Sequence, residues 1–187
     1  AQSKSPQIHF FQGDMQQSFI EKSNSKKFNV ILSLFGCIGY ILTAEGVLNS
    51  FKNMYEALAD GNEMSVAFIE LFLRPNELTE GNPRLTSYTG EDCCIARMSK
   101  IIWKVPREKL AEIKDEDEKT RIEMHLEYLI NYRGREKMEM EHFKEVHEMQ
   151  LFSHEQFIAL AKQAGFKQAY VTQMKDTMRD VLVLSKN

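Results

Sequence analysis

Four side chains that can exchange a proton or accept a hydrogen bond stand out against the apolar pattern around them. Glu70 interrupts the apolar segment 64–73, so it is either buried with a partner or directed into a cleft. His147 is either a half-buried sheet histidine or part of a substrate pocket, whereas the acidic neighbours of His142 favour an ordinary strand position. Asp14 directly follows a short apolar segment, where a plain turn residue is the simplest interpretation. Such groups predict acid–base chemistry or polar recognition.

Composition and cysteine spacing exclude several classes of protein. The 187 residues are 43% hydrophobic and carry a net charge of -3, which is ordinary for a chain that buries a core. Lys and Arg are nowhere concentrated without acids, so no nucleic-acid partner is predicted. No apolar run approaches the ~18 residues of a membrane span. Cys37, Cys93 and Cys94 lack the spacing of a zinc site, so we expect no metal, reduced thiols and a cytoplasmic location.

The N-terminal part of the sequence has the pattern of a βαβ unit. The segment 28–35 is almost continuously apolar, which is typical of a parallel strand buried on both faces. Thr43 is a suitable helix N-cap, and the apolar residues after it recur at three- and four-residue spacing. The expected elements are strands at 7–11, 28–35 and 64–73 and a helix from Thr43 to Gly61.

After Arg74 the pattern changes to that of an antiparallel sheet. Residues 75–89 predict an irregular connection, and alternating segments then predict a meander of about three strands. The meander strands are expected at 93–105, 121–132 and 138–152, followed by a helix at 153–165 and strands at 169–172 and 181–185. The sequence therefore predicts an α/β core formed by 1–74 and 153–187, with an antiparallel β insertion at 75–152.

Five motifs in this order carry a resemblance to a known family. They are Gln-Gly-Asp-Met at 12–15, a strand followed by a Phe and by a Gly-Tyr pair at 39–40, a Glu-containing strand near position 70, Ala-Arg-x-Ser at 96–99, and His-Phe-x-x-x-His-x-x-x-Leu-Phe at 142–152. Together they resemble class I S-adenosylmethionine-dependent methyltransferases, most closely the TDP-sugar N,N-dimethyltransferases of amino-sugar biosynthesis. The resemblance covers nearly the whole chain. It implies a partial class I methyltransferase sheet, Rossmann-like, that carries the antiparallel β insertion.

The resemblance implies S-adenosylmethionine as the cofactor and a small-molecule methyl acceptor, with a sugar amine as the first candidate. It implies that Asp14 accepts a hydrogen bond from the adenine amino group while the Met15 backbone faces the ring. A carboxylate suits this contact because it only accepts. Ser33 and Leu34 are the other expected cofactor residues, since open α/β sheets bind ligands at the carboxyl ends of their strands.

Methyl transfer to an amine needs alignment, exclusion of water and an acceptor for one proton. The expected catalytic residues are Tyr40, Glu70 and His147. The expected substrate residues are Phe35, Arg97 and His142.

The glycine-rich loop of the family and its ribose-binding acid would precede the strand at 7–11, and neither occurs in these residues. We therefore expect a methyltransferase fragment that binds the cofactor weakly or not at all by itself. The free edge of strand 28–35 is expected to be filled by 7–11 or by a second copy. The aromatic-rich insertion is expected to cover the substrate and to pair in a homodimer.

Two alternatives stay open. The chain is either an enzyme or a non-catalytic interaction and dimerisation module derived from the same fold. If it is an enzyme, its acceptor is either an amine or a carboxylate or hydroxyl group.

Overall fold

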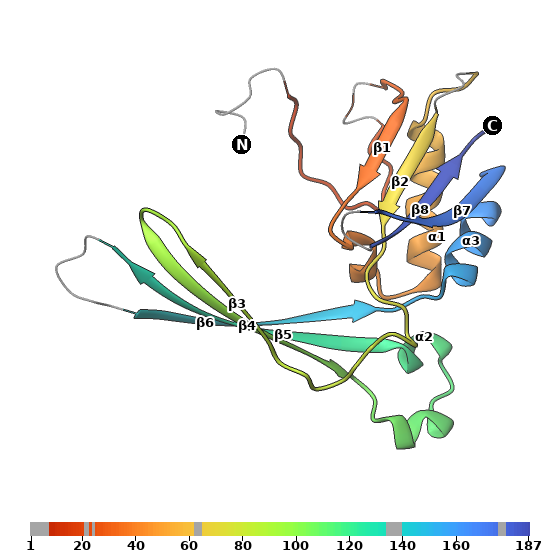
Figure 1. Cartoon of the computed structure of the whole chain (residues 1–187). Helices are drawn as coiled ribbons and strands as arrows, with labels where there is room; N and C mark the ends of the chain where they lie inside the picture. Colours follow the sequence, from red (N-terminus) through yellow and green to blue (C-terminus); the bar gives the residue numbers. More distant parts are fainter. Residues whose placement is uncertain (1–7, 21–22, 24, 62–64, 134–139, 176–178) are drawn as a thin grey trace. The chain divides into compact units, whose positions relative to one another are not determined.

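The structure of the protein, a computed structural model, describes residues 8–20, 23, 25–61, 65–133, 140–175 and 179–187. It divides the chain into two compact units (Figure 1). The core unit comprises Ala1–Phe72 and His154–Asn187, and the insertion unit comprises Leu73–Ser153. Gln7, Met64 and Met138, with which three of the expected strands begin, lie outside the described residues.

The core unit consists of one mixed sheet and two main helices. Its elements are β1 (Val30–Ser33), α1 (Ala44–Ala57), β2 (Val66–Glu70), α3 (His154–Gln163), β7 (Gln168–Gln173) and β8 (Asp180–Ser185). The strand order is β1-β2-β8-β7; β1 and β2 are parallel, and the other neighbours are antiparallel. Helices α1 and α3 cover one face of this sheet (Figure 1). They meet through Phe51 and Phe157, whose ring centroids lie 6.3 Å apart.

Helix α1 begins where its sequence predicts. Oγ1 of Thr43 accepts a hydrogen bond of 3.1 Å from the N–H of Gly46, which caps the first turn. The helix ends at Ala57, earlier than the expected Asp-Gly pair. It ends there because Leu58 adopts an extended conformation, is fully buried and forms a parallel bridge with Phe28.

Two expectations for the N-terminal strands are wrong. Residues 8–11 are exposed and form no strand, because no described strand lies beside them to complete a hydrogen-bond ladder. Strand β1 covers only part of 28–35 and is not buried on both faces, since Val30 is 42% exposed and Leu32 is 60% exposed. Among the described strands β1 has one neighbour, β2, so its other edge carries no added strand.

The insertion unit is an antiparallel meander of four strands. They are β3 (Arg84–Thr89), β4 (Cys93–Trp103), β5 (Arg121–Tyr132) and β6 (Met140–Gln150), paired in that order. Two short helices, η3 (Arg107–Glu112) and α2 (Glu116–Lys119), connect β4 to β5. Strand β3 lies in the segment predicted to be irregular. All its residues are exposed at the sheet edge. The strand therefore has no buried face, and its sequence lacks the alternation of apolar and polar residues that would predict a strand.

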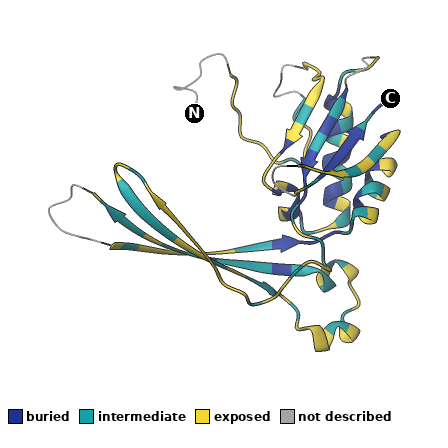
Figure 2. Ribbon diagram, in the orientation of Figure 1, coloured by how far each residue is buried: buried dark blue, intermediate teal, exposed yellow. Residues whose placement is uncertain are grey.

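The register assigns each side chain of this sheet to one of two faces, because directly opposed residues point the same way. The aromatic face carries Arg97, Trp103, Tyr128, Tyr132, Phe143 and His147. The polar face carries Lys100, His125, Glu127, His142 and Lys144. On the aromatic face Trp103, Ile122 and Met149 lie side by side and are buried, so one end of the sheet holds its small core (Figure 2).

Candidate functional site

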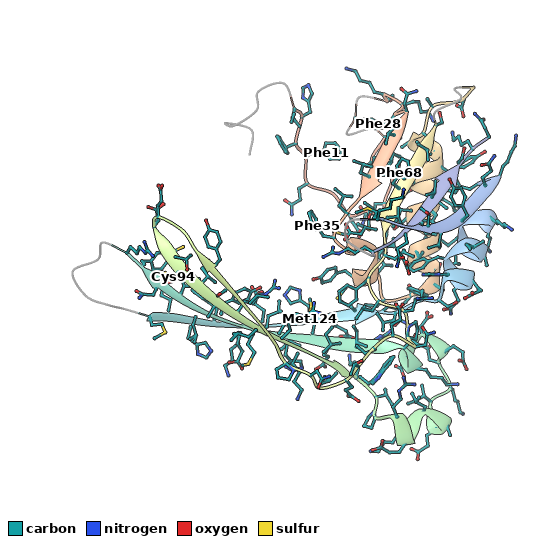
Figure 3. The ribbon with its side chains drawn as sticks, in the orientation of Figure 1. Phe11, Phe28, Phe35, Phe68, Cys94 and Met124 are labelled. Carbon is teal, nitrogen blue, oxygen red and sulfur yellow. The ribbon has the colours of Figure 1, made fainter. Side chains whose placement is uncertain are left out.

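The carboxyl ends of β1 and β2 meet at one edge of the core sheet, because the two strands are parallel neighbours. Ser33 is the last residue of β1 and Glu70 the last of β2. The backbone N–H of Phe35 donates a hydrogen bond of 2.8 Å to Oε2 of Glu70. Figure 3 shows Phe35 at this end of β1. The fold thus brings three of the predicted site residues together.

Ser33 presents an unsatisfied hydroxyl at this edge. The residue is only 8% exposed, and its Oγ has no hydrogen-bond partner in the part of the chain that the structure describes. Such a group costs about 1–3 kcal/mol when it is left unpaired. A ligand with a polar atom at this position would recover that free energy. The next residue, Leu34, is exposed.

Asp14 and Met15 form a turn that is fastened to helix α1. Oδ1 of Asp14 accepts the N–H of Gln16 at 2.9 Å, and its carbonyl oxygen accepts the N–H of Gln17 at 3.1 Å. Nδ2 of Asn53, on α1, donates a hydrogen bond of 3.0 Å to the carbonyl of Met15. Asp14 therefore has the turn role that its position favours, and α1 fixes the backbone beside it.

Gly46 allows this turn to approach the helix. A side-chain carbon at Gly46 would collide with Oε1 of Gln16 and would lie 2.5 Å from Cγ2 of Ile41. Side-chain carbons essentially never lie so close to other atoms, so any side chain at this position forces Gln16 and Ile41 to shift. The sequence pattern gave no signal for this role, because the contact joins the helix to a loop thirty positions earlier.

Tyr40 ends a 3₁₀ helix, η2 (Cys37–Tyr40), that follows the carboxyl end of β1. Gly36 precedes this helix in the left-handed conformation, with a φ of 67°. Tyr40 is 45% exposed, so a ligand at this edge has access to it. The predicted residue thus belongs to the same end of the core unit as Ser33.

Both carboxylate oxygens of Glu70 are occupied. Oε2 accepts from Phe35, and Oε1 accepts from Nη1 of Arg179, which directly precedes β8. Burial raises the pKa of Glu70, but the hydrogen bonds from Phe35 and Arg179 and the charge of Arg179 outweigh it. The pKa therefore lies below its ordinary value of 4.5. The interpretation of Glu70 as buried with a partner is the one that the structure shows.

The sequence did not identify Arg179. A carboxylate inside an apolar strand signals that a cation lies nearby. It does not say which cation, and Arg179 is 109 positions away. Only the antiparallel pairing of β2 with β8 brings the two residues together.

In the insertion unit, Arg97, Tyr128 and Phe143 are directly opposed on three adjacent strands of the aromatic face. His147 lies on the same face, opposite Met124, which is labelled in Figure 3. Nε2 of His147 is 3.2 Å from Oε2 of Glu145. These four residues therefore place a guanidinium group, an imidazole and two aromatic rings on the same face of the sheet.

His142 lies on the polar face, so the sheet separates it from Arg97 and His147. Its Nε2 is 3.4 Å from Oε2 of Glu127, whose Oε1 accepts a hydrogen bond of 3.1 Å from Nζ of Lys144. The hydrogen bond from Lys144, followed by that from His142, lowers the pKa of Glu127 despite partial desolvation. His142 thus has the ordinary strand position that its acidic neighbours favour.

A pocket of about 650 Å³ opens in the insertion unit beside strands β3 and β4. Its volume suits a small-molecule ligand. None of the predicted substrate residues lines it. Its lining combines aliphatic and polar side chains, namely Leu73, Glu77, Leu78, Thr79, Asn82, Pro83, Arg84, Leu85, Ser99 and Ile101.

Within the described ranges, no group of three or more His, Cys, Asp or Glu side chains is placed to hold a metal ion. The three cysteines are free. Sγ of Cys94, which is labelled in Figure 3, lies 3.7 Å from Nη2 of Arg133. None of the described helices is long and apolar enough to cross a membrane.

Comparison with known proteins gives matches to solved structures alone, because no protein-family model and no curated protein matches the chain. DesVI of Streptomyces venezuelae is 19% identical, with a TM-score of 0.80 over all of this chain and 68% of its own. CalS10 of Micromonospora echinaspora, an amino pentose methyltransferase solved with S-adenosylmethionine bound, is 17% identical, with a TM-score of 0.76 over all of this chain and 68% of its own. The chain has the fold of the class I methyltransferases.

A third structure of this methyltransferase fold is the sugar N-methyltransferase KedS8 of Streptoalloteichus. It is 18% identical, with a TM-score of 0.73 over all of this chain and 65% of its own. The chain thus spans about two thirds of the length of each of these structures. The predicted fold class, a partial Rossmann-like sheet with an antiparallel insertion, is confirmed, and so is the resemblance at the level of the fold.

Within this methyltransferase fold the predicted site residues fall into two groups. The insertion unit holds Arg97, His142 and His147. The core unit holds Asp14, Met15, Ser33, Leu34, Phe35, Tyr40 and Glu70.

Proposed function

We propose that this chain carries the donor-binding edge of an S-adenosylmethionine-dependent methyltransferase that acts on a small molecule. The observation that carries the proposal is the buried, unsatisfied hydroxyl of Ser33 at the carboxyl end of β1. In open α/β sheets this is the end at which ligands bind. The fold shared with CalS10, over the whole of this chain, adds support.

The residues present fit S-adenosylmethionine. The Asp14 carboxylate has room for further hydrogen bonds beyond the one to Gln16, since an ionised carboxylate has about four acceptor positions. It would accept a hydrogen bond from the adenine amino group. The Met15 backbone, whose carbonyl is held by Asn53, would lie against the adenine ring. The Ser33 hydroxyl would donate a hydrogen bond to the cofactor or accept one from it. When bound, the cofactor supplies a methyl group activated by its sulfonium charge.

The acceptor that this proposal favours is a sugar amine, because CalS10 and KedS8 are described as amino pentose and sugar N-methyltransferases. On the aromatic face, Tyr128 and Phe143 offer apolar rings against which an acceptor packs and water is excluded. Arg97, which lies beside Tyr128 on the neighbouring strand β4, would hold an anionic group of the acceptor. His147 or Tyr40 would take up the proton that the amine loses.

A homodimer is part of the proposal. Phe143 is 48% exposed on the aromatic face, and Tyr88, in register with that face on β3, is 62% exposed. A two-fold pairing of two such faces would cover these rings. We also propose a cytoplasmic location, which the three free cysteines support.

A second candidate, an interaction module without catalysis, draws on the open edge of β1. Val30 and Leu32 are exposed on this strand, no described strand pairs with its open edge, and no Pro or charged residue interrupts it. A strand from a partner protein would pair with this edge and cover the apolar side chains. This candidate predicts protein binding without affinity for S-adenosylmethionine.

Calorimetric titration of the complete protein that contains these residues distinguishes the two. The methyltransferase proposal predicts saturable binding of S-adenosylmethionine, weakened in Asp14→Ala and unchanged in Glu91→Gln, a charge-matched substitution at an exposed position of the insertion unit. Methyl transfer is then assayed with amino sugars and with matched hydroxyl and carboxylate analogues. Absence of binding in the complete protein would reject the enzyme and leave the interaction module.

A further inference from the structure

The turn after β1 is held in a conformation that its sequence does not favour. Phe35 has a φ of 60° and Gly36 a φ of 67°, so two consecutive residues are left-handed. Glycine adopts this conformation freely, but an aromatic residue rarely does, because its Cβ crowds the backbone. Strained residues of this kind persist only where their surroundings fix them, and they concentrate at functional sites.

Two sets of contacts fix this turn. Glu70, of whose side chain 7% is exposed, accepts the N–H of Phe35 at 2.8 Å and is itself held by Arg179. On the other side Gly36 packs on Phe72, since an added side-chain carbon would lie 3.2 Å from its Cβ and 3.5 Å from its Cα. The turn is therefore restrained from both sides.

The strain has one visible consequence, which is the position of the Phe35 ring. The residue is 77% exposed although it has the largest apolar side chain of the turn. Folding alone gains nothing from exposing an aromatic ring in a strained backbone. The arrangement is explained if the ring contacts a ligand at the carboxyl end of β1.

We infer that Glu70 and Arg179 form a positioning pair that holds the Phe35 turn, so that the Phe35 ring forms a wall of the donor pocket. Glu70 acts through Phe35 rather than as the base, because its buried carboxylate is paired with the Arg179 guanidinium and with the Phe35 N–H. The inference rests on the proposed function in so far as the pocket is that of the methyl donor. The restraint of the turn by Glu70 and Arg179 does not depend on that proposal.

Amide hydrogen exchange tests the restraint without any activity measurement. In Glu70→Ala, exchange of the Phe35 N–H should accelerate at least about tenfold, the equivalent of losing one hydrogen bond to a charged group. Glu70→Gln retains an acceptor but not the charge and should accelerate exchange less, which keeps the test valid if the alanine variant is unstable. Asp60→Asn breaks the ion pair with Lys186 in the same unit and should change nothing at Phe35. Unchanged exchange in both Glu70 variants overturns the inference.

Kinetics of the complete protein separate positioning from catalysis. Glu70→Gln and Arg179→Gln should raise the KM for S-adenosylmethionine by roughly tenfold and leave the shape of the kcat–pH profile unchanged. Removal of a general base would instead lower kcat by about 100-fold or more and abolish the acidic limb of the profile. That second outcome would overturn the positioning role. If the wild type binds no donor, the proposed function fails, while hydrogen exchange still decides whether Glu70 and Arg179 restrain the turn.

Discussion

Replacing Gly46 with alanine tests whether the Asp14 turn must lie against helix α1. The added carbon would collide with Oε1 of Gln16 and would lie 2.5 Å from Cγ2 of Ile41. Gln16 is exposed and its long side chain can turn into solvent. Ile41 is 4% exposed and branched at Cβ, so it has to shift within the core.

The two energetic effects of this substitution oppose each other. Alanine gains up to about 1 kcal/mol of helix propensity over glycine, and less than that in the first turn of a helix. Forcing a methyl group into a packed position costs about 1–3 kcal/mol. We therefore expect Gly46→Ala to lower the free energy of unfolding by about 1–2 kcal/mol. Donor binding should weaken as well, because the displaced Gln16 loosens the turn that carries Asp14.

Urea unfolding and calorimetric titration with S-adenosylmethionine measure the two effects. Gly81→Ala is a suitable control, because it adds the same carbon in the insertion unit where no atom lies within 4 Å. With a φ of 82° it should lose stability through backbone strain alone and bind the donor normally. The double variant Gln16→Ala/Gly46→Ala should recover part of the lost stability. A Gly46→Ala protein as stable as the wild type, with unaltered donor affinity, would show that the close approach of the turn has no role.

Four further outcomes are expected. Asp14→Ala should weaken donor binding by about 1–3 kcal/mol in calorimetric titration, with a small loss of stability because its turn also breaks. Thr43→Ala should lower the free energy of unfolding by about 1 kcal/mol in urea, since the α1 cap is lost. If the proposed homodimer forms, Phe143→Ser should shift the protein from dimer to monomer in analytical ultracentrifugation without destabilising it. The stability advantage of the wild type over Glu70→Gln should be full above the ordinary pKa of 4.5 and should fade as the pH falls below it, measured as the difference in Tm. It fades because the Glu70 carboxylate, whose pKa is lowered in the folded state, takes up a proton there.

Local signals made the βαβ unit predictable. The cap at Thr43 and the apolar spacing that follows it act within one helix, so the sequence displays them directly. The burial of β1 could not be predicted in the same way. An apolar run shows that a strand can be buried on both faces. Whether it is buried depends on the strands and helices beside it, which the run itself does not specify.

The candidate site shows the same division between local and long-range information. The position of Ser33 at the carboxyl end of β1 was predictable from the apolar run around it, whereas the strand expected before Asp14 does not form. Arg179 and Gly46 act through contacts between segments far apart in the chain. The separation of His142 from His147 was in fact present in the sequence, since residues five apart in a strand point to opposite faces.

In the proposed function, the donor-side and acceptor-side residues lie on different units of the chain. The donor-side residues lie on core elements that fix one another through Asn53, Gly46 and the pair of Glu70 with Arg179. If these residues bind the methyl donor as proposed, substitutions there should lower kcat/KM for all acceptors by a similar factor, because every acceptor requires the donor. Arg97 and His147 lie on the aromatic face of the insertion sheet, whose side chains can vary without disturbing that rigid edge. Substitutions on this face should therefore change the ratio of kcat/KM between acceptors, which is the measure of specificity, while donor affinity stays constant.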